Sequence, residues 1–323
     1  ARIAVRVSVM PVSDGEIIVL RILRETGKAL TLPDLGIRKE ALNDTAPLSV
    51  IERNIRKPHG IIFVTGPTGS GKTTTLYAML QSLNQPGVNI ATIEDPIEYR
   101  IPGINQTQVR SDIGLTFANG LRSLLRQDPN IIMVGEIRDN ETASLAINAA
   151  LTGHLVLSTL HTNSAAGSLP RLLDMKVEPF LIASTINAII SQRLVRRLHE
   201  EQEVRRLKPE ELALLRQDSD LDAIFIMLKK EKVIDAKMTP EKMEWGWAKK
   251  SDEAPDGYKG RIGIHEVLEM SDTIRALIMK NSTSEEIEKQ ARDEGMLTMR
   301  EEGFIRAAQK ITSIEEVLRV TSE

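Results

Sequence analysis

Residues 66–74 read GPTGSGKTT and match the pattern G-x-x-x-x-G-K-[ST] at every fixed position. An apolar run at 61–64 precedes this segment and a helical pattern at 74–83 follows it, in the strand, loop and helix order of a phosphate-binding loop. Lys72 is expected to contact the β- and γ-phosphates, and the Thr73 hydroxyl to ligate Mg²⁺. Glycines let backbone N–H groups turn inward around phosphate oxygens beside a helix N-terminus. We therefore predict a nucleoside triphosphate site, here called the phosphate loop, formed by Gly66, Pro67, Thr68, Gly69, Ser70, Gly71, Lys72, Thr73 and Thr74.

An alternation of strand and helix patterns extends from this loop along the chain. Short runs rich in β-branched residues lie at 61–65, 90–93, 131–134 and 155–160, and longer amphipathic stretches separate them. Such alternation is typical of a largely parallel sheet flanked by helices. The sequence therefore predicts an α/β fold.

The two ends of the chain carry other patterns. Residues 2–9 and 16–23 alternate or run apolar around a turn that contains Pro and Gly, which predicts a β-hairpin. Near the other end, between 273 and 320, the spacing of capping boxes predicts helices. The two boxes are Thr283 with Glu286, and Ser313 with Glu316.

A second apolar strand ends in an acidic residue. The run at 131–134 is followed by Gly135, Glu136 and Arg138, so this strand would deliver a carboxylate beside the phosphate loop. Gly135 stands where such a strand usually carries Asp. Glu136 is therefore the candidate to hold Mg²⁺ or to orient the attacking water, and Arg138 is expected to pair with Glu136 or with phosphate.

Three acidic residues, Glu94, Asp95 and Glu98, follow the strand at 90–93. Pro96 keeps Asp95 out of the helical conformation, so these carboxylates should lie on an irregular turn. Acids clustered near a magnesium and phosphate site are the setting for a general base that acts on water. A solvated acidic turn is the alternative. Residues 94–99 are called the acidic turn below.

Histidines and arginines supply further candidates. His154 and His161 bracket the run at 155–160, and their odd spacing would point them to opposite faces of a regular strand. One of them could sense the γ-phosphate while the other bonds the backbone. Arg122 and Arg126 lie four residues apart on a predicted helix at 115–127 and share a face. They form either a solvated basic face or a contact to phosphate across a subunit boundary.

Composition excludes several classes of protein. The net charge is −3 and aromatic residues make up 3% of the 323 residues, which argues against a protein that coats nucleic acid. Cysteine is absent, so disulfides, thiolate zinc sites and cysteine nucleophiles are excluded. No apolar run is long enough for a membrane span, and arginines interrupt the apolar N-terminus, unlike a signal peptide. The start within a strand pattern suggests a fragment of a longer protein.

Taken together, these segments resemble the secretion ATPase family, and within it the type II secretion and type IV pilus assembly (extension) ATPases. The resemblance rests on GPTGSGKTT at 66–74, ATIEDPIEY at 91–99, LRSLLRQDPNIIMVGEIRD at 121–139 and ALTGHLVLSTLHTN at 150–163. Flanking segments such as GYKGRIGIHEVLEM at 257–270 match the same subgroup. Only about residues 199–254 fall outside the resemblance.

The resemblance implies a homo-hexamer of RecA-like ATPase domains, each with a mobile N-terminal domain docked across the subunit interface. By position, residues 91–99 fall on the family's Asp box, with Glu98 as the candidate base, and Glu136 falls on the Walker B acid. His154 and His161 fall on the His box. Arg6 and Arg21 match arginines of the N-terminal domain that reach toward bound nucleotide.

The resemblance also implies a division of the chain into parts. Residues 1–26 would end an N-terminal α+β domain, 27–47 form a linker, 48–195 the RecA-like core and 259–323 a helical C-terminal subdomain. Many relatives carry a zinc-binding insert with paired cysteines at 196–258. Here that segment, called the insert, is densely charged, with short helix patterns at 210–216 and 221–230. We expect no zinc there.

The implied activity is ATP hydrolysis, with Mg²⁺, that powers assembly of a pseudopilus or pilus. The implied partners are an inner-membrane platform protein and a cytoplasmic docking protein, with no nucleic acid, and the implied location is the cytoplasm at the inner membrane. A RecA-like nucleic-acid motor, a regulatory module without turnover and a pilus retraction ATPase are the alternatives. The sequence leaves open the choice between type II secretion and pilus assembly, and between Glu98 and Glu136 as the base.

Overall fold

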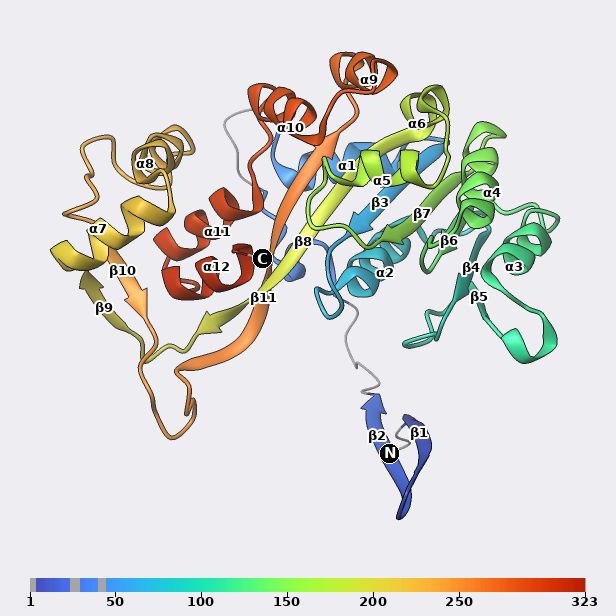
Figure 1. Cartoon of the computed structure of the whole chain (residues 1–323), viewed down its shortest axis with the longest axis horizontal. Helices are drawn as coiled ribbons and strands as arrows, with labels where there is room; N and C mark the ends of the chain where they lie inside the picture. Colours follow the sequence, from blue (N-terminus) through green and yellow to red (C-terminus); the bar gives the residue numbers. More distant parts are fainter. Residues whose placement is uncertain (1–3, 24–29, 40–44, 323) are drawn as a thin grey trace.

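The structure, a computed structural model, describes residues 4–23, 30–39 and 45–322 (Figure 1). In this part of the chain seven strands form one sheet in the order β11-β8-β3-β7-β6-β4-β5. Neighbouring strands from β8 to β5 run parallel, and β11 pairs antiparallel with β8. The strands are β3 (Gly60–Thr65), β4 (Ile90–Glu94), β5 (Asn105–Gln108), β6 (Ile131–Val134), β7 (Leu155–Leu160), β8 (Ile186–Leu198) and β11 (Tyr258–Glu269). The predicted α/β class and largely parallel sheet are confirmed.

Helices cover both faces of this sheet, because the buried strands are apolar on both sides. On β3, Ile61 and Phe63 point into one core and Ile62 and Val64 into the other, as the two-residue period of a strand requires. One core is covered by α1 and α2, and the other by α3, α4, α5, α6, α9 and α10. These helices are α1 (Pro47–Ile55), α2 (Lys72–Leu83), α3 (Phe117–Leu124), α4 (Asn140–Leu151), α5 (Ser168–Asp174), α6 (Pro179–Thr185), α9 (Asp272–Met279) and α10 (Ser284–Asp293).

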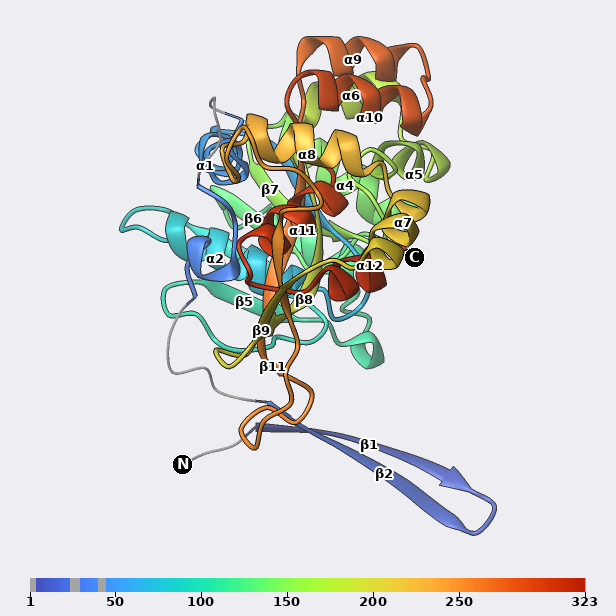
Figure 2. The same cartoon turned by 90° about the vertical axis from the view of Figure 1, so that its left-hand side faces the viewer.

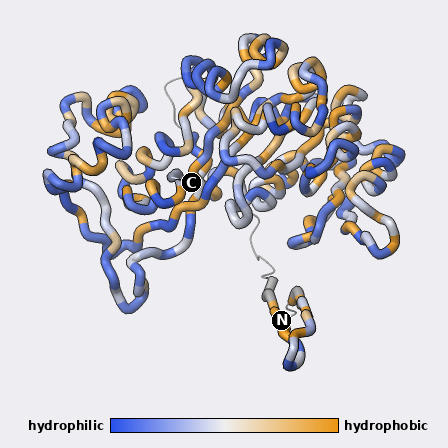
Figure 3. Tube along the Cα trace, in the orientation of Figure 1, coloured by the Kyte–Doolittle hydropathy of each residue, from blue (hydrophilic) through white to orange (hydrophobic). Residues whose placement is uncertain are grey.

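The insert and the last two helices form a separate cluster at the end of the molecule opposite α3 and α4 (Figure 1). Trp245 is 1% exposed and meets Phe225 and Phe304 edge to face, with ring centroids 6.3 and 6.4 Å apart. Figure 3 shows more hydrophilic colour in this part than along the central sheet. Its elements are β9 (Glu203–Arg206), α7 (Pro209–Asp218), α8 (Leu221–Lys230), β10 (Glu244–Trp247), α11 (Met299–Ala308) and α12 (Ile314–Thr321).

The N-terminal hairpin consists of β1 (Ala4–Val12) and β2 (Gly15–Leu23), paired antiparallel as predicted. Two views place it away from the sheet and its helices (Figures 1 and 2). Between the hairpin and α1, Leu32 and Ile37 pack into the core on the α1 and α2 side. Arg38 is buried between Glu231 of the insert and Glu302 of α11, at 2.7 and 3.0 Å. The described part of the predicted linker therefore packs against the body of the molecule.

Three local predictions differ from the structure. Residues 259–269, predicted within a helical C-terminal subdomain, instead form nearly all of β11 in the central sheet, since Ile262, Ile264 and Leu268 are buried beside β8. The helix predicted at 115–127 is α3, Phe117–Leu124; it starts later because the Thr116 side chain caps it, and it ends earlier, at Leu124.

The third difference concerns a helix cap. The capping box at Thr283 and Glu286 is confirmed. At α12 Ser313 caps the backbone, but the Glu316 side chain binds Arg196 and Arg319 instead of closing the box.

None of the helices in the described ranges is both long enough and apolar enough to cross a membrane.

Candidate functional site

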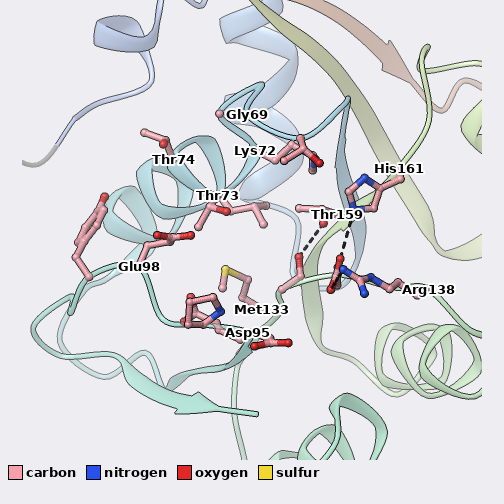
Figure 4. Close-up of a pocket in the computed structure, with 18 of the residues that line it drawn as sticks. Gly69, Lys72, Thr73, Thr74, Asp95, Glu98, Met133, Arg138, Thr159 and His161 are labelled. Atoms are coloured by element: carbon pink, nitrogen blue, oxygen red, sulfur yellow. Dashed lines mark hydrogen bonds and ion pairs between the residues drawn. The ribbon is translucent and has the colours of Figure 1, made fainter. Parts of the chain in front are cut away.

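The phosphate loop leads from the end of β3 into the start of α2 (Figure 4). Gly66, Gly69 and Gly71 have φ values of 138°, 80° and 91°, a region that favours glycine. A Cβ atom on Gly66 would also lie 2.5 Å from the carbonyl oxygen of Gln192. The sequence places glycines where the backbone must turn tightly before the helix.

Lys72 is held inside this loop. Its ammonium group donates to the carbonyl oxygens of Gly66 and Pro67 at 2.8 and 3.1 Å. Burial lowers the pKa of Lys72, and Arg193 acts in the same direction while Glu136 opposes it. The cation therefore stands at the centre of the turn, within electrostatic reach of the acid predicted to serve the same site.

Gln192 of β8 supports the phosphate loop through side-chain hydrogen bonds. It was not predicted from the sequence. Its amide nitrogen donates to the carbonyl oxygen of Ser70 at 2.7 Å, and its amide oxygen accepts from the Thr75 hydroxyl at 2.8 Å. Gln192 is 2% exposed. No local signal singled it out, because β8 also carries Asn187, Ser191 and Arg193 as buried polar residues, each of which needs partners.

A cavity of about 910 Å³ opens beside the loop. Figure 4 shows Lys72, Thr73, Glu98 and His161 around it. Its predicted lining residues are Thr68, Gly69, Gly71, Lys72, Thr73, Thr74, Glu94, Asp95, Glu98, Glu136, Arg138 and His161. Met133, Thr159, Leu194 and Arg261 also line it and were not predicted. The carboxyl ends of parallel strands meet at this edge of the sheet, which brings distant segments of the sequence together.

Glu136 follows β6 and is fixed by two cationic or polar neighbours. Arg138 pairs with one carboxylate oxygen at 2.7 Å, and Nε2 of His161 lies 3.3 Å from the other. The Thr159 hydroxyl donates to the carbonyl oxygen of Gly135 at 2.7 Å, which ties this segment to β7. Of the two partners considered for Arg138, the structure shows Glu136.

Glu94, at the end of β4, differs from the other acids of the acidic turn. It is 2% exposed and accepts hydrogen bonds from Thr92 at 2.5 Å, from Gln106 at 3.1 Å and from the Tyr77 hydroxyl. Burial raises the pKa of Glu94, and these three hydrogen bonds oppose the rise. Asp95 and Glu98 are exposed at the cavity. Glu98 is therefore better placed than Glu94 to reach a water molecule.

His154 is a correction to the predicted site. It precedes β7, whereas His161 follows it, and six residues of strand separate the two by about 20 Å. The ring of His154 lies 2.9 Å from the carbonyl oxygen of Ala149, outside the cavity lining. Of the two histidines, only His161 reaches the site within this chain.

Arg122 and Arg126 also lie outside the cavity lining. Arg122 forms an exposed ion pair with Glu141 at 2.5 Å, and Arg126 donates to the carbonyl oxygen of Arg122 at 3.1 Å. Within this chain they belong to a solvated face. Their contact with phosphate across a subunit boundary stays a prediction.

Arg6 and Arg21 occupy directly opposite backbone positions in the hairpin. Their side chains lie outside what the structure describes. Their predicted approach to nucleotide therefore stays a prediction.

The donor set at the cavity fits Mg²⁺ bound with a triphosphate. In such sites Mg²⁺ takes one or two protein ligands and completes its shell with phosphate oxygens and water. The Thr73 hydroxyl and the Glu136 carboxylate both line the cavity. Among the described residues, no cluster of three or more His, Cys, Asp or Glu side chains is arranged to hold a metal. The predicted lack of zinc in the insert stays a prediction.

Comparison with known proteins adds a family match. A family model described as "Type II/IV secretion system protein" matches residues 1–319. The chain is 47% identical to "Type II secretion system protein E" of Xanthomonas campestris pv. campestris over 98% of its own length and 52% of that protein. It is 45% identical to "Type IV pilus assembly ATPase PilB" of Thermus thermophilus over 98% of its length and 33% of that protein.

Among solved structures, the chain resembles the pilus retraction motor PilT with bound ADP. The TM-score is 0.66 at 27% sequence identity, covering 99% of this chain and 74% of that one. This similarity agrees with the α/β fold described above. The chain spans about half the length, or less, of the two curated relatives just named.

Proposed function

The chain belongs to the Type II/IV secretion system protein family, and on this basis we propose that it is the ATP-hydrolysing part of a motor. The motor would power assembly of a type II secretion pseudopilus or a type IV pilus. Relatives from both machines match nearly the whole chain, at 47% and 45% identity. The proposal therefore covers the step that both machines share. A retraction motor is less favoured, because that neighbour is 27% identical, and a nucleic-acid motor has no counterpart in the family match.

One observation carries the proposal. Residues from four separate segments, Lys72, Glu98, Glu136 and His161, converge on one cavity at the carboxyl edge of the sheet. A site that only bound nucleotide would need the phosphate loop but not the acids and the histidine. This convergence supports turnover over a regulatory binding role.

The division of labour follows from the chemistry of each group. The phosphate loop and Lys72 would bind the phosphates of ATP, and the Thr73 hydroxyl with Glu136 would hold Mg²⁺. Bound there, Mg²⁺ neutralises charge that develops on the phosphate oxygens. Glu98 would accept a proton from the attacking water as general base. His161, 3.3 Å from Glu136, would keep that carboxylate oriented.

Assembly into a homo-hexamer is part of the proposal. The N-terminal hairpin, with Arg6 and Arg21, would belong to a domain that closes over nucleotide, and Arg122 and Arg126 would face a neighbouring subunit. The hexamer would sit at the cytoplasmic face of the inner membrane on a platform protein and a docking protein. Resemblance to the family supports these partners.

Phosphate release from ATP tests the proposal. Lys72→Ala should abolish nucleotide binding or turnover, because it removes the cation at the centre of the phosphate loop. Lys250→Ala is the matched control, since Lys250 is exposed in the insert and should leave turnover unchanged. Near-normal hydrolysis by Lys72→Ala would refute the assignment of the phosphate loop.

A further inference from the structure

Tyr77 connects the helix that follows the phosphate loop with the acidic turn. It lies four residues after Thr73 on α2, on the same helical face, and is fully buried. Its ring meets Tyr99 of the acidic turn edge to face, with centroids 4.6 Å apart. Tyr77 therefore links α2, which begins with Lys72 and Thr73, to the acidic turn, and both elements are predicted to act on the same substrate.

The hydroxyl of Tyr77 uses all of its hydrogen-bonding capacity. It donates to the carboxylate of Glu94. It accepts from the backbone N–H of Glu98 at 3.3 Å and from the amide nitrogen of Gln106 at 3.3 Å. A phenol has one donor and two acceptor positions, so each is matched. The contact with Glu98 is direct and involves the backbone of the candidate base.

Glu94 and Gln106 complete the anchor. The amide nitrogen of Gln106 shares its two N–H groups among Tyr77, Glu94 and the carbonyl oxygen of Tyr99, the last at 3.1 Å. Its amide oxygen accepts from the backbone of Ile101 at 2.7 Å, which holds the far side of the acidic turn. Burial raises the pKa of Tyr77, and the neighbouring Glu94 adds to the rise, so the hydroxyl keeps its proton. Both ends of the acidic turn are thus fixed to α2 through a neutral phenol.

We infer that Tyr77 is a positioning residue, which holds Glu98 at a fixed place relative to the phosphate loop. The inference rests on the proposed hydrolysis of ATP. Catalysis is sensitive to such placement, since a displacement of about 1 Å can cost on the order of 10²-fold in rate. Tyr77 does not reach the cavity lining itself, so it acts through Glu98.

The test is Tyr77→Phe in the intact protein, which keeps the ring and removes the hydroxyl. We expect kcat to fall by roughly tenfold while KM and nucleotide affinity change by less than about twofold. Tyr258→Phe is the matched control. It removes a hydroxyl bonded to Ser313 at 2.7 Å, away from the cavity, and should leave kcat unchanged.

The same substitution made in the Glu98→Gln variant separates a positioning role from general support of the fold. If Tyr77 acts through Glu98, Tyr77→Phe should add little to the loss caused by Glu98→Gln, because coupled residues are not additive. A multiplicative loss in that background, or unchanged kcat in the otherwise unmodified protein, would overturn the inference. If thermal melting shows that Tyr77→Phe does not fold, Gln106→Leu takes its place in the same test. Absence of ATP turnover before any substitution would instead refute the proposed function, and this inference with it.

Discussion

His265 and Glu266 are consecutive buried residues of β11 whose ionisation affects stability in opposite directions. Burial raises the pKa of Glu266 to about 7, above its ordinary value of 4.5. Its contribution to stability is present at low pH and is lost as pH rises toward 7. Burial lowers the pKa of His265 to about 3, below its ordinary value of 6.5, and Arg306 adds to this. Its contribution is present above pH 6.5 and is lost as pH falls.

Between pH 5 and 6.5 the two effects oppose each other. Glu266→Gln removes one of them, so the stability of the variant relative to the unmodified protein should increase with pH across this window. The change should be about 2 kcal/mol, at 1.36 kcal/mol per pH unit. Denaturant unfolding at several pH values measures it. A stability difference that does not vary with pH would contradict the buried, ionisable state of Glu266.

Residues of the site differ in how far sequence could predict them. Lys72 and Thr73 were predictable because one local pattern sets both their conformation and their chemistry. Gln192 and Tyr77 were not, because their partners lie 122 and up to 29 positions away in the sequence. His154 was assigned to the site because it falls on the family's His box together with His161, although the strand predicted between them places the two histidines at opposite ends of β7.

At the scale of elements, the insert contributes to an apolar core, whereas relatives are expected to stabilise the same segment with bound zinc. The apolar faces of α7, α8 and β10 pack against α11 and α12 around Trp245. Sequence patterns predicted the two helices of the insert, and α8 has the predicted bounds. They did not predict what the helices pack on, since α11 lies about 80 residues further along the chain. β11 was not predicted as a strand for the same reason, because its partner strand β8 lies on the other side of the insert in the sequence.

The insert should therefore depend on packing and not on a metal. Trp245→Ala should lower stability by about 3–5 kcal/mol, the range for removing a buried Trp. A chelator should leave the melting temperature unchanged. Calorimetry with and without chelator, together with elemental analysis for zinc, checks both expectations. Stoichiometric zinc, or a chelator-dependent loss of stability, would show that the insert binds metal after all.

At the scale of the whole molecule, the hairpin would couple hydrolysis to movement. If Arg21 reaches nucleotide, Arg21→Ala should lower turnover by roughly tenfold or more while nucleotide affinity stays closer to normal, since the charge acts mainly in the transition state. Steady-state kinetics of the assembled protein measure this. Arg197→Ala removes an exposed arginine elsewhere and serves as the control. Unchanged turnover in Arg21→Ala would remove the proposed link between hydrolysis and domain position.

The central claim is that the acids around the cavity hydrolyse the ATP that the phosphate loop binds. Nucleotide affinity and turnover of Glu98→Gln and Glu136→Gln, measured on the same preparations, test it most directly. The account predicts affinity within about threefold of normal and turnover reduced by at least ~10²-fold in each variant. Normal turnover by Glu98→Gln would contradict its role as the base, and normal turnover by both variants would contradict the account of the site.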